Sequence, residues 1–235
     1  MRIHIPRQWG GQAQPANIRL FSAPENVPLR QTGGTANDAS CLNKTAVYGI
    51  AAITSVDDIR NAIAFARDNG LRVTSAGQQH SMGGQSFVRG GLVLDMKGFK
   101  GMALDKARGV LTVQSGAIWA DVQRLLDKEG FSVKAMQSIN IFTVGGTLSV
   151  NAHGIAHDPG PIAPTVRSLR IIASNGQLFT ASPTENPDLF RHVLGGYGLF
   201  GIIVDAELDV VPNATYAWTR EQMDYRDFPA YYKKI

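Results

Sequence analysis

Short apolar runs and one helical repeat alternate in the first half of the chain. Residues 47–53 are an apolar run of the length typical of a buried strand, and residues 71–75 and 92–96 are predicted as further strands. Ser55 and Asp58 form an imperfect capping box after the first run, which predicts the start of a helix. Its apolar face repeats at i, i+3, i+4 and i+7, at Ile59, Ala62, Ile63 and Ala66. The pattern predicts a β-α-β arrangement.

The second half has a different pattern, with strands that a short turn can connect directly. The predicted elements are a strand at 111–114, a helix at 118–129, strands at 166–173 and 177–181, a short helix at 186–194 and a long strand at 202–211. Asn175 and Gly176 separate two of these strands, and Asn-Gly favours a tight hairpin turn. We therefore predict an α+β fold with two lobes, at about 37–100 and 101–212, that share a cleft.

The two ends of the chain lack a sustained period. Residues 1–36 mix Gly, Pro, Gln and Asn, which predicts an irregular arm, and they lack a signal-peptide pattern, so we expect a cytoplasmic protein. Residues 213–235 are rich in aromatic side chains and end without a finished element. We expect them to begin a further, truncated domain.

Composition excludes several classes of protein. The single cysteine, Cys41, excludes an internal disulfide framework and a multi-cysteine metal site. No apolar run approaches the roughly 18 residues of a membrane helix, so no transmembrane segment is predicted. The net charge of +4 is mild and dispersed, so no nucleic-acid partner is expected. The 25 glycines are more than ordinary usage gives, and ten of them lie in three clusters.

The first cluster connects two predicted strands and contains Ser75, Ala76, Gly77, Gln78, Gln79, His80, Ser81, Met82, Gly83, Gly84 and Gln85. Small residues let successive N–H groups converge on an anion such as a pyrophosphate, although a long flexible connection explains the composition equally well.

The second cluster runs from Thr143, Val144, Gly145 and Gly146 to Val150, Asn151, Ala152, His153 and Gly154. It reads as a loop that enters a short helix. Its N–H groups face a second phosphate or a ring, or the cluster is a turn beside a buried helical segment.

The third cluster satisfies G-x-G-x-x-G at Gly196, Gly198 and Gly201. A dinucleotide fingerprint follows a strand and opens a helix, whereas here a predicted helix precedes and a strand follows, so we reject a Rossmann site. His153 and His157 stand four residues apart, but Gly154 and nearby prolines oppose a helix there and no third ligand is evident, so no metal site is predicted. No G-x-S-x-G elbow supports a serine hydrolase.

In their order and spacing, residues 55–59, 77–81, 92–96, 143–146, 152–154, 194–198 and 201–203 resemble the PCMH-type FAD-binding domain of the vanillyl-alcohol oxidase/p-cresol methylhydroxylase superfamily. The resemblance covers residues 37–212. It is strongest to the sugar branch: alditol oxidases, gulonolactone and arabinonolactone oxidases, and decaprenylphosphoryl-ribose oxidases.

The resemblance implies an FAD cofactor. It implies that loop 75–85 surrounds the pyrophosphate, that residues 143–146 and 150–153 hold the cofactor from the other lobe, that Ile203 contacts the nucleotide and that Ser138 approaches the ring system. It further implies that His80 is bonded covalently to the flavin, with a non-covalent cofactor hydrogen-bonded by His80 as the alternative.

The reaction implied is oxidation of an alcohol group on a polyol, sugar or sugar lactone by hydride transfer to flavin N5, with O₂ or another acceptor taking the electrons. The resemblance places the general base in a C-terminal substrate domain, which leaves His153 as a weak candidate in this chain. In lactone-oxidising relatives the residue at the position of Gln137 influences access of oxygen, and the bulky Gln here leaves open whether O₂ or another acceptor is used. Two alternatives remain: an enzyme like the decaprenylphosphoryl-ribose oxidases with non-covalent FAD, and an FAD-binding module without turnover.

Overall fold

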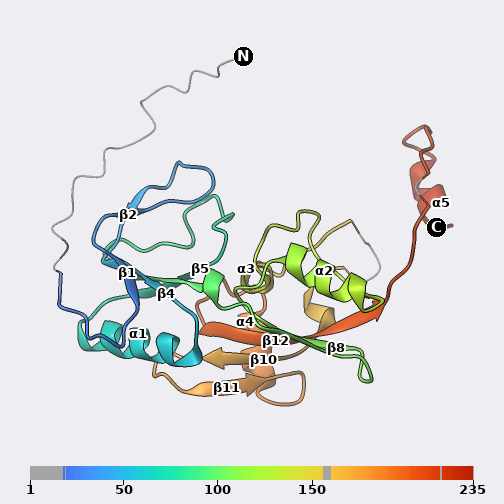
Figure 1. Ribbon diagram of the computed structural model, residues 1–235. Helices are drawn as coiled ribbons and strands as arrows, with labels where there is room; N and C mark the ends of the chain where they lie inside the picture. The colour runs from blue at the N-terminus through green and yellow to red at the C-terminus, as the bar shows by residue number, and fades with distance from the viewer. Residues whose placement is uncertain (1–17, 19, 156–159, 218, 235) are drawn as a thin grey trace.

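The first sheet of the protein has four strands packed on one helix. The computed structural model describes residues 18, 20–155, 160–217 and 219–234. The strand order is β1 (Leu29–Thr32), β4 (Gly49–Ala52), β6 (Leu92–Asp95) and β5 (Val73–Ala76). Strands β4, β6 and β5 are parallel, while β1 is antiparallel to β4. Helix α1 (Val56–Asp68) connects β4 to β5, which confirms the predicted β-α-β arrangement (Figure 1).

Helix α1 begins where the capping pattern predicts. The Ser55 side chain accepts a hydrogen bond from Asp58 N, and the Asp58 carboxylate accepts one from Ser55 N in return. The same carboxylate also accepts hydrogen bonds from the backbone and hydroxyl of Thr54. Burial raises the pKa of Asp58, but these hydrogen bonds outweigh it and hold the pKa below its ordinary value.

The second sheet is antiparallel. Its order is β11 (Leu178–Ala181), β10 (Val166–Ile172), β12 (Ile202–Pro212), β8 (Val110–Gln114) and β7 (Met102–Asp105), and β9 (Phe131–Val133) pairs with the far end of β12. Helices α2 (Trp119–Lys128), α3 (Val144–Val150) and α4 (Pro187–Val193) accompany it, and 3₁₀ turns occupy Met96–Gly98 and Ala163–Thr165. The predicted hairpin is confirmed, because β10 and β11 pair antiparallel around the Asn175-Gly176 turn.

The predicted irregular arm over residues 1–36 is wrong for its last part. Strand β1 pairs with β4, and β2 (Thr35–Ala36) pairs with β3 (Thr45–Ala46). Leu29 is the one apolar residue of β1, so this short edge strand carries almost no apolar signal. Residues 1–17 and 19 lie outside the described residues.

One core joins the two sheets. The cluster around α1 includes Ile172 of β10 and Val204 of β12, which belong to the second sheet. At the same junction Gly116 N donates to Phe99 O at 2.8 Å, and a Cβ on Gly116 would lie 1.7 Å from Met96 O. The backbones therefore cross in direct contact, and only glycine fits there.

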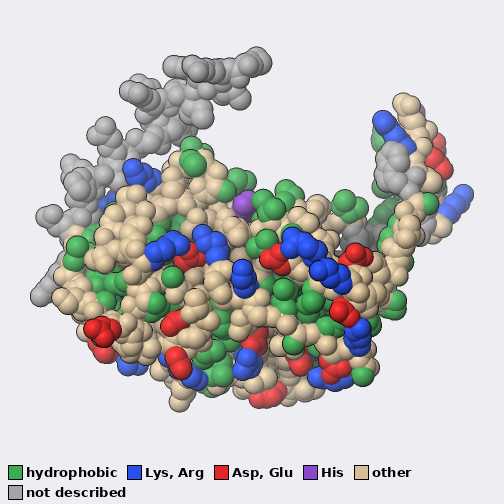
Figure 2. All heavy atoms as spheres, viewed as in Figure 1, with side chains coloured by type: hydrophobic (Ala, Val, Ile, Leu, Met, Phe, Trp, Pro, Cys, Tyr) green, Lys and Arg blue, Asp and Glu red, His purple; other side chains and the backbone are tan. Residues whose placement is uncertain are grey.

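The chain leaves the second sheet after β12. Residues 213–217 are exposed and lead to α5 (Phe228–Tyr232), which lies apart from both sheets in Figure 1. Within the described ranges, no helix has the length and apolar character required to span a membrane. Figure 2 shows basic and acidic side chains mixed across the face in view.

Candidate functional site

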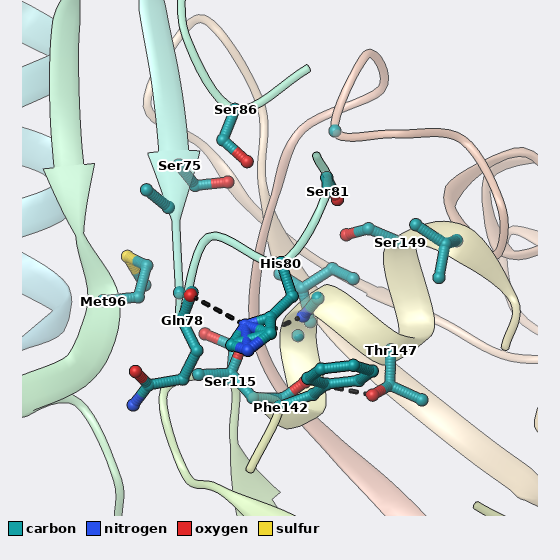
Figure 3. A pocket seen from close by; sticks show the side chains of 18 of the residues that line it. Ser75, Gln78, His80, Ser81, Ser86, Met96, Ser115, Phe142, Thr147 and Ser149 are labelled. Atoms are coloured by element: carbon teal, nitrogen blue, oxygen red, sulfur yellow. Dashed lines mark hydrogen bonds between the residues drawn. The ribbon is translucent and has the colours of Figure 1, made fainter. Parts of the chain in front are cut away.

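A cavity of about 360 Å³ lies where the two sheets meet (Figure 3). One wall is the loop that leaves the carboxyl end of β5, the position at which parallel sheets commonly bind ligands. The opposite wall is formed by α3 and the turn before it, together with Gly198, Gly201 and Ile203 near the start of β12. The topology thus brings all three glycine clusters to one cavity.

The loop wall presents unused hydrogen-bond donors. Within the described part of the chain, the backbone N–H groups of residues 77–81 donate no hydrogen bond to protein atoms. Gln79 has φ +59°, in the left-handed region that non-glycine residues seldom adopt. Alternation between right- and left-handed backbone curves successive N–H groups toward one point and forms an anion-binding concavity. This loop can therefore hold a phosphate group.

The N–H groups of the second cluster are already used within the protein. Val144 N donates to Ala117 O and Gly145 N to Ser115 O, both at 2.8 Å, while Gly146 N donates to the Thr143 hydroxyl at 3.3 Å. The expectation that these N–H groups face a phosphate is corrected. The turn lines the cavity but offers no phosphate donors at these three positions.

Glycines set the distance between the two walls. A Cβ on Gly77 would lie 2.1 Å from the Thr143 hydroxyl oxygen, and a Cβ on Gly145 would lie 2.7 Å from Ser115 Cβ. Both lie well inside van der Waals contact. A side chain at either position would separate segments that now define the cavity.

Ser115 supplies a buried polar atom without a protein partner. Ser115 is 4% exposed, its hydroxyl makes no hydrogen bond to any residue that the structure describes, and it lines the cavity. An unpaired buried hydroxyl is costly, and a ligand oxygen would satisfy it. The free N–H groups and this hydroxyl therefore fit a cofactor that carries phosphate and other acceptor oxygens.

His80 is held at the cavity wall by two contacts. Its Nδ1 lies 3.1 Å from Gln78 O, and its ring lies 4.7 Å from the Phe142 ring, centroid to centroid (Figure 3). A carbonyl oxygen only accepts, so Nδ1 donates in this hydrogen bond, and in the corresponding neutral tautomer the lone pair lies on Nε2.

Most predicted site residues line the cavity. Those that do are Ser75, Ala76, Gly77, Gln78, Gln79, His80, Ser81, Gln85, Thr143, Gly145, Gly146, Val150, Ala152 and Ile203. Those outside the lining are Met82, Gly83, Gly84, Ser138, Val144, Asn151 and His153. Residues 82–84 instead turn toward loop 37–43, as described below.

The remaining outliers have identifiable places. Val144 is buried in the core, and Ser138 is exposed. Asn151 ends α3 in the left-handed region, with its side-chain oxygen accepting from Ala163 N. His153 is exposed and pairs with Pro161 in an isolated bridge rather than a helix. His157 lies outside the described residues, and among those described no three His, Cys, Asp or Glu side chains gather as a metal site would require.

Gln137 lies in a buried chain of hydrogen bonds under α3. Its Oε1 accepts from the Thr147 hydroxyl at 2.8 Å, and that hydroxyl accepts from Trp119 Nε1 at 2.7 Å. Gln137 is 6% exposed and does not line the cavity. Its side chain positions α3 instead of facing a ligand.

Sequence reasoning missed several lining residues: Ser86, Met96, Ser115, Phe142, Thr147, Ser149, Tyr197, Gly198 and Gly201. The last three belong to the third glycine cluster, which was rejected as a Rossmann motif. The predicted order of a helix before the cluster and a strand after it is confirmed, because α4 precedes the cluster and β12 follows it. Ser86 and Phe142 adjoin the first and second clusters, and Thr147 and Ser149 lie within the second. Met96 and Ser115 reach the cavity only through the packing of distant segments.

Comparison with known proteins identifies a family. Residues 48–182 match the family described as FAD binding domain. Cytokinin dehydrogenase 2 of Arabidopsis thaliana is 34% identical over 222 residues, which cover 92% of this chain and 43% of that protein. A putative D-arabinono-1,4-lactone oxidase of Neurospora crassa is 30% identical over 183 residues, covering 77% of this chain and 33% of that protein.

Cytokinin dehydrogenase 7 of Oryza sativa subsp. japonica is 37% identical over 151 residues, covering 60% of this chain and 28% of that protein. The chain thus spans less than half the length of these relatives. The match over residues 48–182 is the finding that decides the family. The chain belongs to the FAD binding domain family, and its cofactor is FAD.

Proposed function

We propose that this member of the family is the cofactor-holding part of an FAD-dependent oxidoreductase, and that residues 77–81 receive the FAD pyrophosphate. The unused N–H groups of that loop carry the proposal. Bound FAD supplies a two-electron acceptor at flavin N5.

Different parts of the cavity lining would bind different parts of FAD. Residues 77–81 donate hydrogen bonds without adding bulk, and the Ser115 hydroxyl donates one more from the cavity floor. Phe142 and Ile203 provide apolar surface that excludes water and suits a flat ring or a ribose face. Ser138 and His153 lie outside this lining, so their implied contacts depend on parts of the cofactor or substrate beyond the cavity.

We also propose that His80 forms a covalent bond to the C8 methyl carbon of the flavin. A C–N bond replaces one methyl C–H bond, the flavin ring would take up the two electrons, and O₂ or another acceptor would reoxidise it. Its Nε2 lone pair is free while Nδ1 is held by Gln78 O, which leaves one defined nucleophilic nitrogen at the wall. The Phe142 ring restricts rotation of the imidazole. The histidine is thus held in one orientation before FAD enters.

Acid precipitation tests the bond directly. We expect flavin absorbance in the pellet of the wild-type protein and a colourless pellet from His80→Ala, whose flavin stays in the supernatant. His153→Ala is the matched control, because His153 is exposed and outside the lining, and it should keep a yellow pellet. Free FAD in the wild-type supernatant would disprove the covalent bond and leave FAD binding intact. Folded protein without flavin would disprove the role of the cavity.

For the electron donor we propose an alcohol group of a polyol, sugar or sugar lactone, with O₂ or another acceptor reoxidising the flavin. Similarity to the putative D-arabinono-1,4-lactone oxidase supports this class. The described cavity lining contains no carboxylate, and we assign its one histidine, His80, to the flavin bond, so we assign no general base within it. The proton acceptor must come from outside this lining.

Oxidation of a cytokinin is the second candidate, favoured by the several cytokinin dehydrogenases among the relatives. Anaerobic mixing of flavin-loaded protein with each donor class discriminates the two. Flavin bleaching by a lactone, alditol or sugar supports the first proposal, and bleaching by a cytokinin alone supports the second. No bleaching with any donor supports an FAD-binding module without turnover.

A further inference from the structure

The loop of residues 37–43 is hydrogen-bonded at three points to residues 79–84, which include the end of the proposed phosphate-binding segment 77–81. Ala39 N donates to Gln79 O at 3.0 Å, and the Asn43 side-chain amide donates to Met82 O at 2.8 Å. The third point is Gly84, whose N–H donates to the Asp38 carboxylate at 3.1 Å. Each contact falls on the stretch that carries the free N–H groups or immediately follows it.

Asp38 accepts hydrogen bonds from both sides of this contact. It is 4% exposed, and its two carboxylate oxygens accept four hydrogen bonds. The donors are Ser40 N at 3.1 Å, the Ser40 hydroxyl at 2.5 Å, the Asn43 amide at 2.7 Å and Gly84 N at 3.1 Å. An ionised carboxylate only accepts, so it matches a shell made entirely of donors.

The shell around Asp38 is neutral. Within the described residues no Lys, Arg or His forms a salt bridge with it, and its partners come from its own loop and from residue 84. A buried charge without a cation depends on its hydrogen bonds. Burial raises the pKa of Asp38, but the hydrogen bonds outweigh it and keep the pKa below its ordinary value.

We propose that Asp38 is a positioning residue for FAD, which acts by holding residues 79–84 so that the N–H groups of 77–81 stay aimed into the cavity. Asp38 does not line the cavity itself. The left-handed backbone of Gln79 needs an outside constraint, and its carbonyl is fixed by Ala39, the neighbour of Asp38. The inference rests on the proposed phosphate role of 77–81.

The same coupling appears in the packing of Gly84. Its φ is +76°, and a Cβ there would lie 3.2 Å from two atoms of the Asn43 side chain. The two loops therefore touch by packing as well as by hydrogen bonds. Loss of the Asp38 charge would release both loops together, because Asp38 also holds Asn43 in place.

The test uses Asp38→Asn in a His80→Ala parent, so that flavin binds reversibly. The Asn side chain has the shape of Asp, but its NH₂ group would face the N–H and O–H groups that now donate to the Asp38 carboxylate. We expect the Kd for FAD, measured by quenching of flavin fluorescence, to rise about tenfold or more. In flavin-free protein we expect faster hydrogen exchange at Gly84 and Ala39, whose N–H groups are hydrogen-bonded between the two loops, and unchanged exchange in β10 and β12.

Asp58→Asn is the matched control. Asp58 also accepts several neutral hydrogen bonds and has a lowered pKa, but it caps α1 and contacts neither loop. We expect this variant to lose stability and keep the parent Kd. Equal Kd increases in the two variants, or unchanged exchange at Gly84 and Ala39 in Asp38→Asn, would overturn the positioning role.

A second variant covers the case in which Asp38→Asn does not fold. Asn43→Ala removes the contact to Met82 O and one donor to Asp38, at a half-buried position. We expect a smaller rise in Kd and faster exchange around residues 82–84. The absence of both changes would overturn the inference. If the parent binds no FAD at all, the phosphate role of 77–81 fails, while exchange in flavin-free protein still decides the role of Asp38.

Discussion

Two glycine-containing segments face the same cavity and use their backbones in opposite ways. Residues 77–81 leave their N–H groups free, whereas the N–H groups of residues 144–146 donate hydrogen bonds to Ala117, Ser115 and Thr143. In the first segment Gly77 allows close approach to Thr143, and in the second Gly145 allows close approach to Ser115. Glycine thus marks close packing in both, and only the tertiary partners decide which segment can bind an anion.

The largest effect is expected in the packed segment. Gly145→Ala would place a Cβ 2.7 Å from Ser115 Cβ and 3.0 Å from Ser115 O, which backbone movement must relieve. We expect the free energy of unfolding of flavin-free protein to fall by about 2 kcal/mol, measured by urea denaturation.

Gly146→Ala is the internal control for that change. Its Cβ would have a single neighbour, the Thr143 hydroxyl at 3.1 Å, and the position is exposed. Stability should stay unchanged or rise by up to about 1 kcal/mol, because alanine favours the helix. Equal losses at the two adjacent glycines would refute the packing explanation.

In the other segment we expect a loss of affinity. Gly77→Ala would collide with three side-chain atoms of Thr143 and push the loop away from the second wall. In the His80→Ala parent the Kd for FAD should rise about tenfold. Adding Thr143→Gly removes those atoms and should restore part of the affinity, while absence of any restoration would contradict the proposed collision.

A smaller effect is expected at Ser115. Ser115→Ala removes a buried hydroxyl that lacks a protein partner, so flavin-free protein should be as stable as the parent or slightly more stable. The Kd for FAD should rise several-fold, by about 1 kcal/mol of binding free energy. Parallel titrations and urea curves separate the two quantities, and unchanged affinity would remove Ser115 from the site.

The smallest effect is a dependence of stability on pH, to which Asp38 behind the first segment and Asp58 at the start of α1 contribute. Asp38 and Asp58 have lowered pKa values, so the unfolded chain binds more protons than the folded one near and below the ordinary value of 3.8. The contribution of these two carboxylates to the free energy of unfolding should therefore be fully present above about pH 5. It should be lost as the pH falls through the ordinary pKa of an aspartate and below it. Asp38→Asn and Asp58→Asn should each make that fall shallower, whereas Gly145→Ala should leave its slope unchanged.

Local signals predicted the parts of the fold whose residues meet their partners nearby. Ser55 and Asp58 satisfy each other across one helical turn, and Asn175-Gly176 closes a hairpin whose strands are adjacent in sequence. Strands β1, β7 and β9 escaped prediction because they are short and their residues are mostly half-buried or exposed. Their pairing is set by β4, β8 and β12 rather than by their own composition.

The candidate site was predictable as far as its glycine clusters extend. Residues 75–81 were predicted from composition, but their free N–H groups follow from the absence of partners, which no sequence pattern encodes. Ser115, Phe142 and Met96 line the cavity because β8, the α3 turn and the end of β6 meet there. Met82 and Gly84 share the loop's composition yet contact residues 37–43, about forty positions earlier.

The crossing at Gly116 limits how the cavity can admit its ligand. Rotating one sheet away from the other would break the bond from Gly116 to Phe99 O and expose Ile172 and Val204, which pack in the core of the first sheet. Clamshell opening is therefore costly, unlike in proteins whose domains close around a hinge. FAD should therefore enter without separation of the two sheets, and the rates of loading and release should depend on loop 77–84 rather than on motion of either sheet.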